Sequence, residues 1–597
     1  MPFKPNKTVN YQDDEIKQLT FLQSLIDESQ EYKKEVAAKY WDDNLKMMEG
    51  EHWPTKRPTY KAAPVVNFIY KLIERGSGLL TDSKPEINIQ TASDKLTPVN
   101  EALKIIIETN WDENEIQGML SEAVFHCQSF GTVGFETLWD DTMDYGQGDI
   151  RLDCIDPRDL DIDPFVTSPR KMRDAEYIVR HTVKPFSYCT WKWPKRAEDI
   201  RPDAGSRSKG ESESKDTGIF DSSGRRIYRW GGGDSKGTVS AIPRCKVQHF
   251  YFKYRDEVND ATKDGKLGLK YPGGVYVIVA GGVVVYRSAN PYWDSKFPTD
   301  VMNWNWRAST IWGKSEVEIL KEAQKHFNKM MALIMENAMM MGNAIWIGDE
   351  DALDPKGWND LVSKPGLLVK KRTQRELRRE YPEPLPAYMF QTLEGLKYYM
   401  EDLVDQTGLA KGTKTGQLQS GIGFETAQMA AQVIVRLKAR ALESVLNSIG
   451  QKYISRIFQY YTDDRILWLA GDSEQAKALQ IARKYIEDNY PGEKIKNAFR
   501  DYKFRIKPGS SLALSKWQQI MLAMQLAESG LIDGLEVLKT IGWPDREKVY
   551  ERAKMERIMG ISPAAVVGKG QKAIGKSSRG EKSIETAIQE ARKEGGM

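Results

Sequence analysis

The sequence predicts an α+β protein that is mainly helical, on three observations. Long segments carry apolar residues near the 3.6-residue period of an amphipathic helix. Shorter segments, mostly between residues 133 and 288, alternate apolar and polar residues as strands do. The chain has 597 residues, of which 40% are hydrophobic and 29% charged. That length allows several domains, and that composition excludes global disorder and collagen-like order.

The N-terminal part is expected to form four helices followed by two strands. Pro54 and Pro58 end the first helical pattern, and Pro85 lies beyond the second. After the fourth helix the apolar period changes from 3.6 to 2. The helices are expected over residues 13–49, 66–80, 97–109 and 117–128, and the strands over 133–139 and 150–154.

Residues 202–240 differ in composition from their surroundings. They are rich in Gly, Ser and charge and nearly free of aliphatic residues, so we expect a flexible insertion there. Strands are expected after it, over 246–254, 275–280 and 283–288. The last two flank Gly281-Gly282, a pair that predicts a hairpin.

A helix of about 26 residues, ~39 Å long, is expected over 316–341. Its six Met between 330 and 341 indicate either helix core or subunit contact, or else a soft, adaptable surface. An insert with turn signals follows over 342–386, and then a second helix over 389–406. Three Trp precede the long helix and are expected to anchor its packing, with base stacking as the alternative: Trp304, Trp306 and Trp312.

The longest predicted helix covers residues 424–461, about 38 residues and ~57 Å, which implies an extended wall or strut. A Gly-punctuated loop over 408–423 precedes it. The apolar seam predicted for this helix includes Ile434, Leu437, Ala441, Val445 and Ile449, and its polar stripe includes Arg436, Arg440, Glu443, Asn447 and Ser455.

The C-terminal part is predicted to be mostly helical. One strand alternates Tyr502, Phe504 and Ile506 with Lys503, Arg505 and Lys507.

The charge balance limits any role with nucleic acid. Lys plus Arg number 87 against 84 Asp plus Glu, a net charge of +3. A protein that holds nucleic acid by overall charge is usually far more basic. Such a role would therefore depend on a local patch, or on passage without tight binding.

Cysteine and histidine usage indicates neither a disulfide framework nor a metal or cofactor site. The four Cys are far apart and form no CxxC pair, and no HExxH is present. The first residues hold no apolar stretch, so we expect no signal peptide. The most hydrophobic stretch, Val275 to Tyr286, is too short to span a bilayer, and no membrane partner is expected.

Two motifs were tested for enzymatic chemistry. The segment Gly408–Thr415 approaches a phosphate-binding loop, but Thr413 stands where the second Gly must be, and a helix precedes it. Asp156, Asp159, Asp161 and Asp163 cluster, but Pro164 and Arg170 occupy positions that a calcium loop needs. A structural turn is one interpretation of the cluster. A metal-dependent nuclease or other DNA-processing enzyme using Asp159, Asp161 and Asp163 is the alternative.

Two groups of basic residues are candidates for contact with phosphate. Arg436 and Arg440 lie one turn apart on the longest helix, where they either approach phosphates in a channel or form ion pairs between subunits. The densest patch is either a solvated face or a contact with DNA or a docking protein: Lys370, Lys371, Arg372, Arg375, Arg378 and Arg379.

The order of features resembles that of the portal proteins, or head-to-tail connectors, of tailed bacteriophages, of the short-tailed-phage type. The resemblance covers roughly residues 30 to 560. His52 stands where the family more usually has Gln. The motifs that carry the resemblance are Tyr40-Trp41 with Glu49–Trp53, Val66–Ile69 with Lys84–Ile87, and Gly313–Val317 with Gln324–Asn328.

The resemblance implies a portal fold, and its parts map onto this sequence. They are a mixed α/β wing (1–312, with the 202–240 insertion), stem helices (313–341 and 389–407), a clip (342–388), a tunnel loop (408–423), a long helix and crown (424–560), and a partly flexible C-terminal tail (561–597).

It also implies a structural role without catalysis or cofactor. The family forms a ring, commonly a dodecamer, at one capsid vertex, through which double-stranded DNA is packaged and ejected. The implied partners are the terminase large subunit, major capsid and scaffolding proteins, and tail adaptor proteins. The implied locations are the virion and, during assembly, the host cytoplasm. Lys411 and Lys414 on the tunnel loop are expected to touch DNA.

Overall fold

A computed structural model describes most of the first half of the chain and several segments of the second. The described residues are 13–53, 57–58, 61–82, 84–91, 97–203, 242–253, 257–258, 268–269, 271, 273–342, 345–349, 351–353, 376–380, 384–404, 433–461, 499–507, 513–541 and a few between 546 and 554. The chain divides into two compact units, Met1–Leu512 and Ala513–Met597. The fold is α+β and mainly helical, as predicted.

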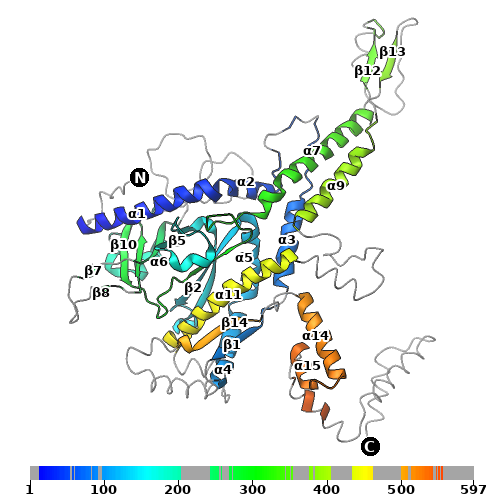
Figure 1. Cartoon of the computed structure of the whole chain (residues 1–597). Helices are drawn as coiled ribbons and strands as arrows, with labels where there is room; N and C mark the ends of the chain where they lie inside the picture. The colour runs from blue at the N-terminus through cyan, green and yellow to red at the C-terminus, as the bar shows by residue number, and fades with distance from the viewer. Residues whose placement is uncertain are drawn as a thin grey trace, which may run out of the picture. The chain divides into compact units, whose positions relative to one another are not determined.

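The first predicted helix is confirmed as one continuous helical run. It consists of α1 (Asp13–Lys33), a π-helical turn (Lys34–Ala38) and α2 (Lys39–Met48). α1 lies along the larger sheet (Figure 1) and buries Leu19, Leu22 and Ile26 against it. In this way the apolar stripe seen in the sequence becomes part of a core shared with the larger sheet.

Two antiparallel sheets form the centre of the first unit. The larger has the strand order β10-β9-β6-β5-β4 and the smaller β11-β2-β3. Gly281 and Gly282 adopt positive φ (55° and 80°) in the turn between β9 and β10, so the predicted hairpin is confirmed. The strand bounds are β2 Thr132–Asp140, β3 Asp149–Ile155, β4 Leu160–Ile162, β5 Tyr177–Pro185, β6 Arg244–Phe252, β9 Val275–Ala280, β10 Val283–Ala289 and β11 Thr299–Asn303.

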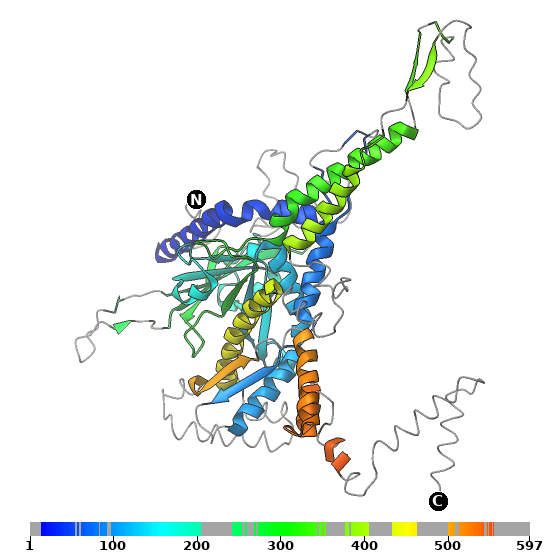
Figure 2. The same cartoon turned by 45° about the vertical axis from the view of Figure 1, so that its right-hand side comes forward.

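The largest hydrophobic core joins segments that are far apart in the sequence. Strand β1 (Ile87–Thr91) pairs with β14 (Tyr502–Ile506) to form a two-stranded antiparallel sheet. Helices α4 (Thr97–Glu113), α5 (Ile116–Phe130) and α11 (Val433–Tyr460) pack into the same core. This core is therefore completed by segments that lie more than 400 residues apart in the sequence. Figure 2 shows β1, β14, α4 and α11 side by side.

Two helices project from this body. Helix α7 (Glu316–Gly342) packs along α9 (Tyr388–Leu403), and the paired strands β12 (Ile345–Gly348) and β13 (Leu377–Glu380) lie at their far end (Figures 1 and 2). Both long helices were predicted within two or three residues. At the near end, α7 and α9 share a core with α2 and α3 (Phe68–Thr81).

The predicted two stripes of the longest helix are wrong in detail. In α11, Ile434 and Leu437 of the predicted apolar seam are 42% and 59% exposed. Glu443 and Ser455 of the predicted polar stripe are buried. The reason is that α11 packs against β14, β11, β2 and α3, so much of its circumference is covered. The predicted start, residues 424–432, lies outside the described residues.

The tryptophan cluster divides into two buried rings and one exposed ring. Trp304 and Trp312 are buried in cores, as the packing interpretation predicts. Trp306 is 68% exposed, and the Arg170 guanidinium lies over its ring at 5.3 Å. The packing interpretation is therefore wrong for Trp306.

The second unit has helices α14 (Ala513–Glu528) and α15 (Gly534–Ile541) in its described part. Gly530 has φ +74°, the left-handed conformation expected of a glycine that ends a helix. The insertion 202–240, apart from residues 202 and 203, lies outside the described residues.

Candidate DNA-channel and assembly surfaces

The start of α7 is fixed by a capping box. Ser315 Oγ accepts a hydrogen bond from the Val317 N–H (3.0 Å), and Glu318 Oε1 accepts one from the Ser315 N–H (3.2 Å). Gly313, just before, lies so close to the carbonyl oxygens of Gly131 and Asn305 that a Cβ would clash with them. The Gly313–Val317 motif therefore sets where α7 begins and how it leaves the body of the first unit.

Three of the family-like motifs meet at one buried network on α7. Gln324 accepts a hydrogen bond from the Phe68 N–H (3.0 Å) and donates to the Val66 carbonyl (2.7 Å). Asn328 donates from Nδ2 to His52 Nδ1 (2.6 Å). Segments 49–53, 66–69 and 324–328, far apart in the sequence, thus bind one another through polar side chains. Sequence reasoning identified the motifs but not this shared purpose.

The hydrogen bonds of His52 define its protonation state. Its Nε2 lies 2.7 Å from the Met47 carbonyl, which can only accept, so Nε2 carries the proton. Nδ1 then accepts from Asn328. Burial lowers the pKa of His52, partly offset by the Met47 hydrogen bond. A second proton, on Nδ1, would face the Asn328 amide donor, so the network requires the neutral ring.

We expect His52→Gln to reduce the loss of stability on acidification. A lowered folded-state pKa means that the unfolded chain binds more protons, so His52 stabilises fully above its unfolded value, about 6.5, and less as pH falls below it. Between pH 7.5 and 5.5, the melting temperature of the variant should fall less than that of wild type, by roughly 2 °C.

The control is His326→Gln, because the His326 side chain is exposed on α7, the helix that carries Asn328. Melting curves of the three proteins at both pH values provide the comparison. A pH dependence of His52→Gln equal to that of wild type would contradict the assigned protonation state.

The projecting helices α7 and α9 expose many apolar side chains. Ten side chains of α7 and α9 are between 39% and 64% exposed: Leu333, Met335, Met339, Met340, Met341, Tyr388, Phe390, Tyr398, Tyr399 and Leu403. The interpretation of the methionines as helix core is therefore wrong for Met335, Met339, Met340 and Met341. Contiguous exposed apolar surface marks a site of association.

The predicted DNA contacts of the channel are only partly described. Arg440 is exposed on α11, and Arg436, one turn away, is half-buried. Arg440 shares the exposed side of the helix with Ile434, Leu437 and Ser444 rather than with a polar stripe. Lys411 and Lys414 lie outside the described residues.

The predicted basic patch is also described only at its end. Arg378 lies on β13, opposite Ile347 of β12, and its side chain is 68% exposed, 3.8 Å from Glu380. Arg379 pairs with Trp346 through the backbone. Lys370, Lys371, Arg372 and Arg375 lie outside the described residues.

The carboxylates of the acidic cluster bind side chains and backbone N–H groups of the protein itself. Asp161 is fully buried; its oxygens accept from Lys33 Nζ (2.5 Å) and His181 Nε2 (2.7 Å). Asp156 binds Arg158 (2.6 Å), and Asp163 accepts from the Phe165 and Glu176 N–H groups (both 2.9 Å). The structural interpretation accounts for these three residues, and nothing supports the nuclease alternative.

The described residues hold neither a candidate metal site nor a membrane-spanning helix. Among them, no group of three or more His, Cys, Asp or Glu is placed to hold a metal ion. In the same part of the chain, no helix combines the length and the apolar character needed to cross a bilayer.

Paired projecting helices with exposed apolar side chains are typical of a structural protein that associates with further protein. The family model of phage P22-like portal proteins matches residues 23–592. The chain belongs to this family of portal proteins, and its role is that of the DNA-packaging channel at the capsid vertex of the virion. A search of curated proteins found no match.

Proposed function

We propose that twelve copies of this chain form a closed ring whose central channel passes double-stranded DNA into and out of the phage head. The observation that carries the proposal is the exposed apolar surface of α7 and α9, in a chain of the portal family. A closed ring needs one surface of a protomer to meet a different surface of its neighbour. Two helices side by side present two such surfaces.

The test of ring formation is negative-stain imaging of the purified full-length protein. Annular particles with a central hole support the proposal, and twelvefold class averages support the dodecamer. A protein that stays monomeric at every concentration and in the presence of capsid and scaffolding proteins would overturn it.

The partners and the site of their docking follow from the same proposal. The terminase large subunit docks at the clip, at Lys370, Lys371, Arg372, Arg375, Arg378 and Arg379, and tail adaptor proteins replace it after packaging. Major capsid and scaffolding proteins surround the ring. Copies of the chain assemble in the host cytoplasm before they enter the virion. ATP hydrolysis belongs to the motor, and the ring itself uses no cofactor and has no catalytic residue.

Within the channel, we place Lys411 and Lys414 of the tunnel loop, with Arg436 and Arg440, against the DNA backbone. Because each neutralised phosphate adds to a salt-dependent affinity, a few cations per protomer are enough to guide the duplex without arresting it. The double variant Lys411→Ala/Lys414→Ala is expected to form normal rings but to change the packaging rate and the retention of packaged DNA.

The control for this variant is Lys296→Ala, which removes an exposed cation from the wing. Packaging of a labelled genome and nuclease protection of the filled head are the measurements. A wild-type packaging rate together with wild-type retention would count against a loop contact with DNA.

A further inference from the structure

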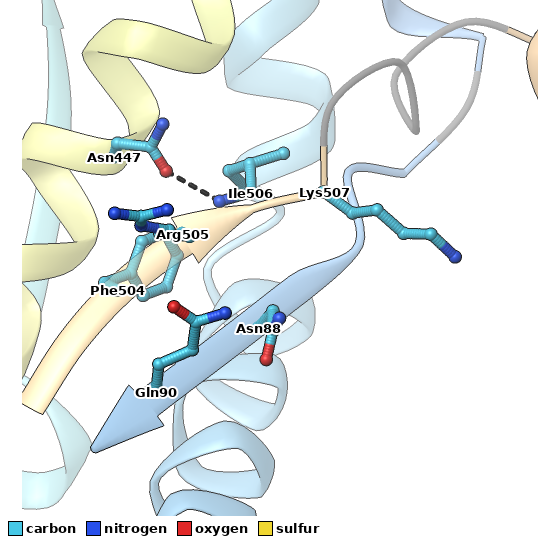
Figure 3. A pocket seen from close by; sticks show the side chains of 7 residues that line it. All are labelled: Asn88, Gln90, Asn447, Phe504, Arg505, Ile506 and Lys507. Atoms are coloured by element: carbon cyan, nitrogen blue, oxygen red, sulfur yellow. Dashed lines mark hydrogen bonds between the residues drawn. The ribbon is translucent and has the colours of Figure 1, made fainter. Parts of the chain in front are cut away.

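Strand β14 and the residue that follows it present three cations on one face of the β1–β14 sheet. Tyr502, Phe504 and Ile506 are buried in the main core, whereas Lys503, Arg505 and Lys507 are exposed. On the same exposed side of β1 lie Asn88 and Gln90, since Asn88 pairs with Arg505 and Gln90 with Lys503. We name the following five residues the basic sheet face: Asn88, Gln90, Lys503, Arg505 and Lys507. Figure 3 shows all of them except Lys503.

The cations of the basic sheet face are largely uncompensated. Lys507 lies 3.2 Å from Glu86, and both side chains are about half exposed, so that pair is weak. Lys503 and Arg505 form no side-chain ion pair or hydrogen bond with any residue that the structure describes. A net positive charge thus remains on a surface made of only two short strands.

The sheet that carries this face is held rigidly by α11. The Asn447 side chain accepts a hydrogen bond from the Ile506 N–H (2.6 Å), and Gln451 accepts from the Phe504 N–H (3.3 Å) and donates to the Tyr502 carbonyl (3.0 Å). These bonds satisfy backbone N–H and C=O groups of β14 on the edge that does not pair with β1. Figure 3 shows Asn447 bonded to this edge, with Gln90, Asn88, Arg505 and Lys507 nearby.

A hollow of about 470 Å³ opens at the basic sheet face. It is lined by Asn88, Gln90, Asn447, Phe504, Arg505, Ile506 and Lys507. The two apolar residues in this lining are only 5% and 3% exposed, so its exposed side chains belong to amide and cationic residues. Protein–protein hot spots are usually aromatic or apolar anchors, and the accessible surface here offers none. The composition therefore favours a polyanion over a protein partner.

We propose that the basic sheet face binds the phosphate backbone of double-stranded DNA. Alternate residues of a strand are about 6.8 Å apart, and successive phosphates of one DNA strand are offset by about 3.4 Å along the helix axis, so long Lys and Arg side chains at this spacing can reach neighbouring phosphates. Lys503, Arg505 and Lys507 can therefore follow one backbone, and the amides of Asn88 and Gln90 can donate to its oxygens. These contacts reach no base edge, so binding is independent of sequence. That the bound DNA is the packaged genome rests on the proposed packaging function.

The test compares assembled wild-type protein with the variant Lys503→Ala/Arg505→Ala/Lys507→Ala. Binding to a fluorescent 30-base-pair duplex is measured by anisotropy between 50 and 200 mM salt. Each lost phosphate contact should lower the slope of log K against log salt by about 0.9, so the triple variant should lose about two to three in slope. Its Kd at 50 mM salt should rise about tenfold or more. The side chains point away from the core, so the fold should be kept.

The matched control removes three exposed cations from elsewhere in the wing, as Arg244→Ala/Arg287→Ala/Lys296→Ala. The control should keep the wild-type slope. Equal loss in both triple variants, or no loss in the β14 variant, overturns the proposal. So does binding of an acidic polypeptide, such as polyglutamate, that is as tight as DNA binding and equally weakened by the β14 substitutions.

The failure of this inference can be distinguished from failure of the packaging role. If wild-type protein forms rings with a central hole but the β14 substitutions leave DNA affinity unchanged, only the basic sheet face is refuted. If no ring forms under any condition, the packaging proposal fails, while the anisotropy experiment still reports on the sheet. A variant with Arg505→Lys alone should keep the slope, because a phosphate contact needs the charge rather than the guanidinium.

Discussion

The double substitution Met335→Asp/Met339→Asp is expected to abolish ring formation. Both side chains lie on the far half of α7 and are 39% and 47% exposed in the single chain. Covering a Met side chain at an interface gains about 1.5–3 kcal/mol, whereas a buried, unpaired carboxylate is strongly unfavourable. Because every interface of the ring repeats the change, the losses accumulate. Sedimentation and negative-stain imaging should show single protomers.

The matched control places two carboxylates on the same helix, as His326→Asp/Lys329→Asp, and changes its charge by one unit more than the methionine variant does. Both of these positions are polar and exposed, so rings should still form. Circular dichroism checks that each variant keeps its helices. Intact rings from the methionine variant, or equal loss in both variants, would show that the apolar stem surface is not what joins the protomers.

Replacement of Asp161 by Asn is expected to lower the free energy of unfolding by about 3–5 kcal/mol. The substitution leaves the Lys33 ammonium buried without its counter-charge, beside the carbonyls of Pro157, Arg158 and Leu160. Burial would raise the pKa of Asp161, but the charges of Lys33 and His181 outweigh it and hold the pKa below its usual range. Denaturant unfolding at fixed protein concentration measures the change.

Two further variants separate this effect from a loss of charge in general. Asp174→Asn removes an exposed carboxylate from the same region and should change stability by less than about 1 kcal/mol. The double variant Lys33→Met/Asp161→Leu removes both charges and should recover much of the loss, since neither partner is left unpaired. A stable Asp161→Asn protein would refute the structural interpretation of the acidic cluster.

The sign of the acid dependence follows from the same ion pair. A lowered folded-state pKa means that Asp161 stabilises fully above its unfolded value, near 3.9, and that this contribution is lost as pH falls through the folded value. The loss of folding stability that is due to protonation of His52 begins at a higher pH, near 6.5. The two contributions therefore occupy separate pH ranges.

Some elements could be predicted closely because their pattern is local. The predicted bounds differ from the observed ones by a residue or less for two elements, the helix at 316–341 and the hairpin at Gly281-Gly282. A long run of residues at the 3.6 period, or two glycines between alternating segments, allows few other conformations. The capping box at Ser315 and Glu318 is equally local.

Other features depend on contacts that no local pattern encodes. The exposure of Leu437 and the burial of Glu443 on α11 were predicted the wrong way round, because several other elements cover this helix. The partner of β14 could not be predicted, since β1 lies more than 400 residues earlier. His52 could be singled out as a departure from the family pattern, but its bond to Asn328 could not.

The amino-acid sequence alone determined the class of fold, the positions of the long helices and strands, and the family to which the chain belongs. These follow from periodicity, turn residues and motif order, which are properties of neighbouring residues. Only the tertiary structure decided which faces of those helices are buried and that Asp161 is bound by Lys33 and His181. It also decided that three cations in and just after β14 share an exposed face with two amides of β1. Burial and pairing across the fold arise from packing between distant segments, so the local pattern cannot specify them.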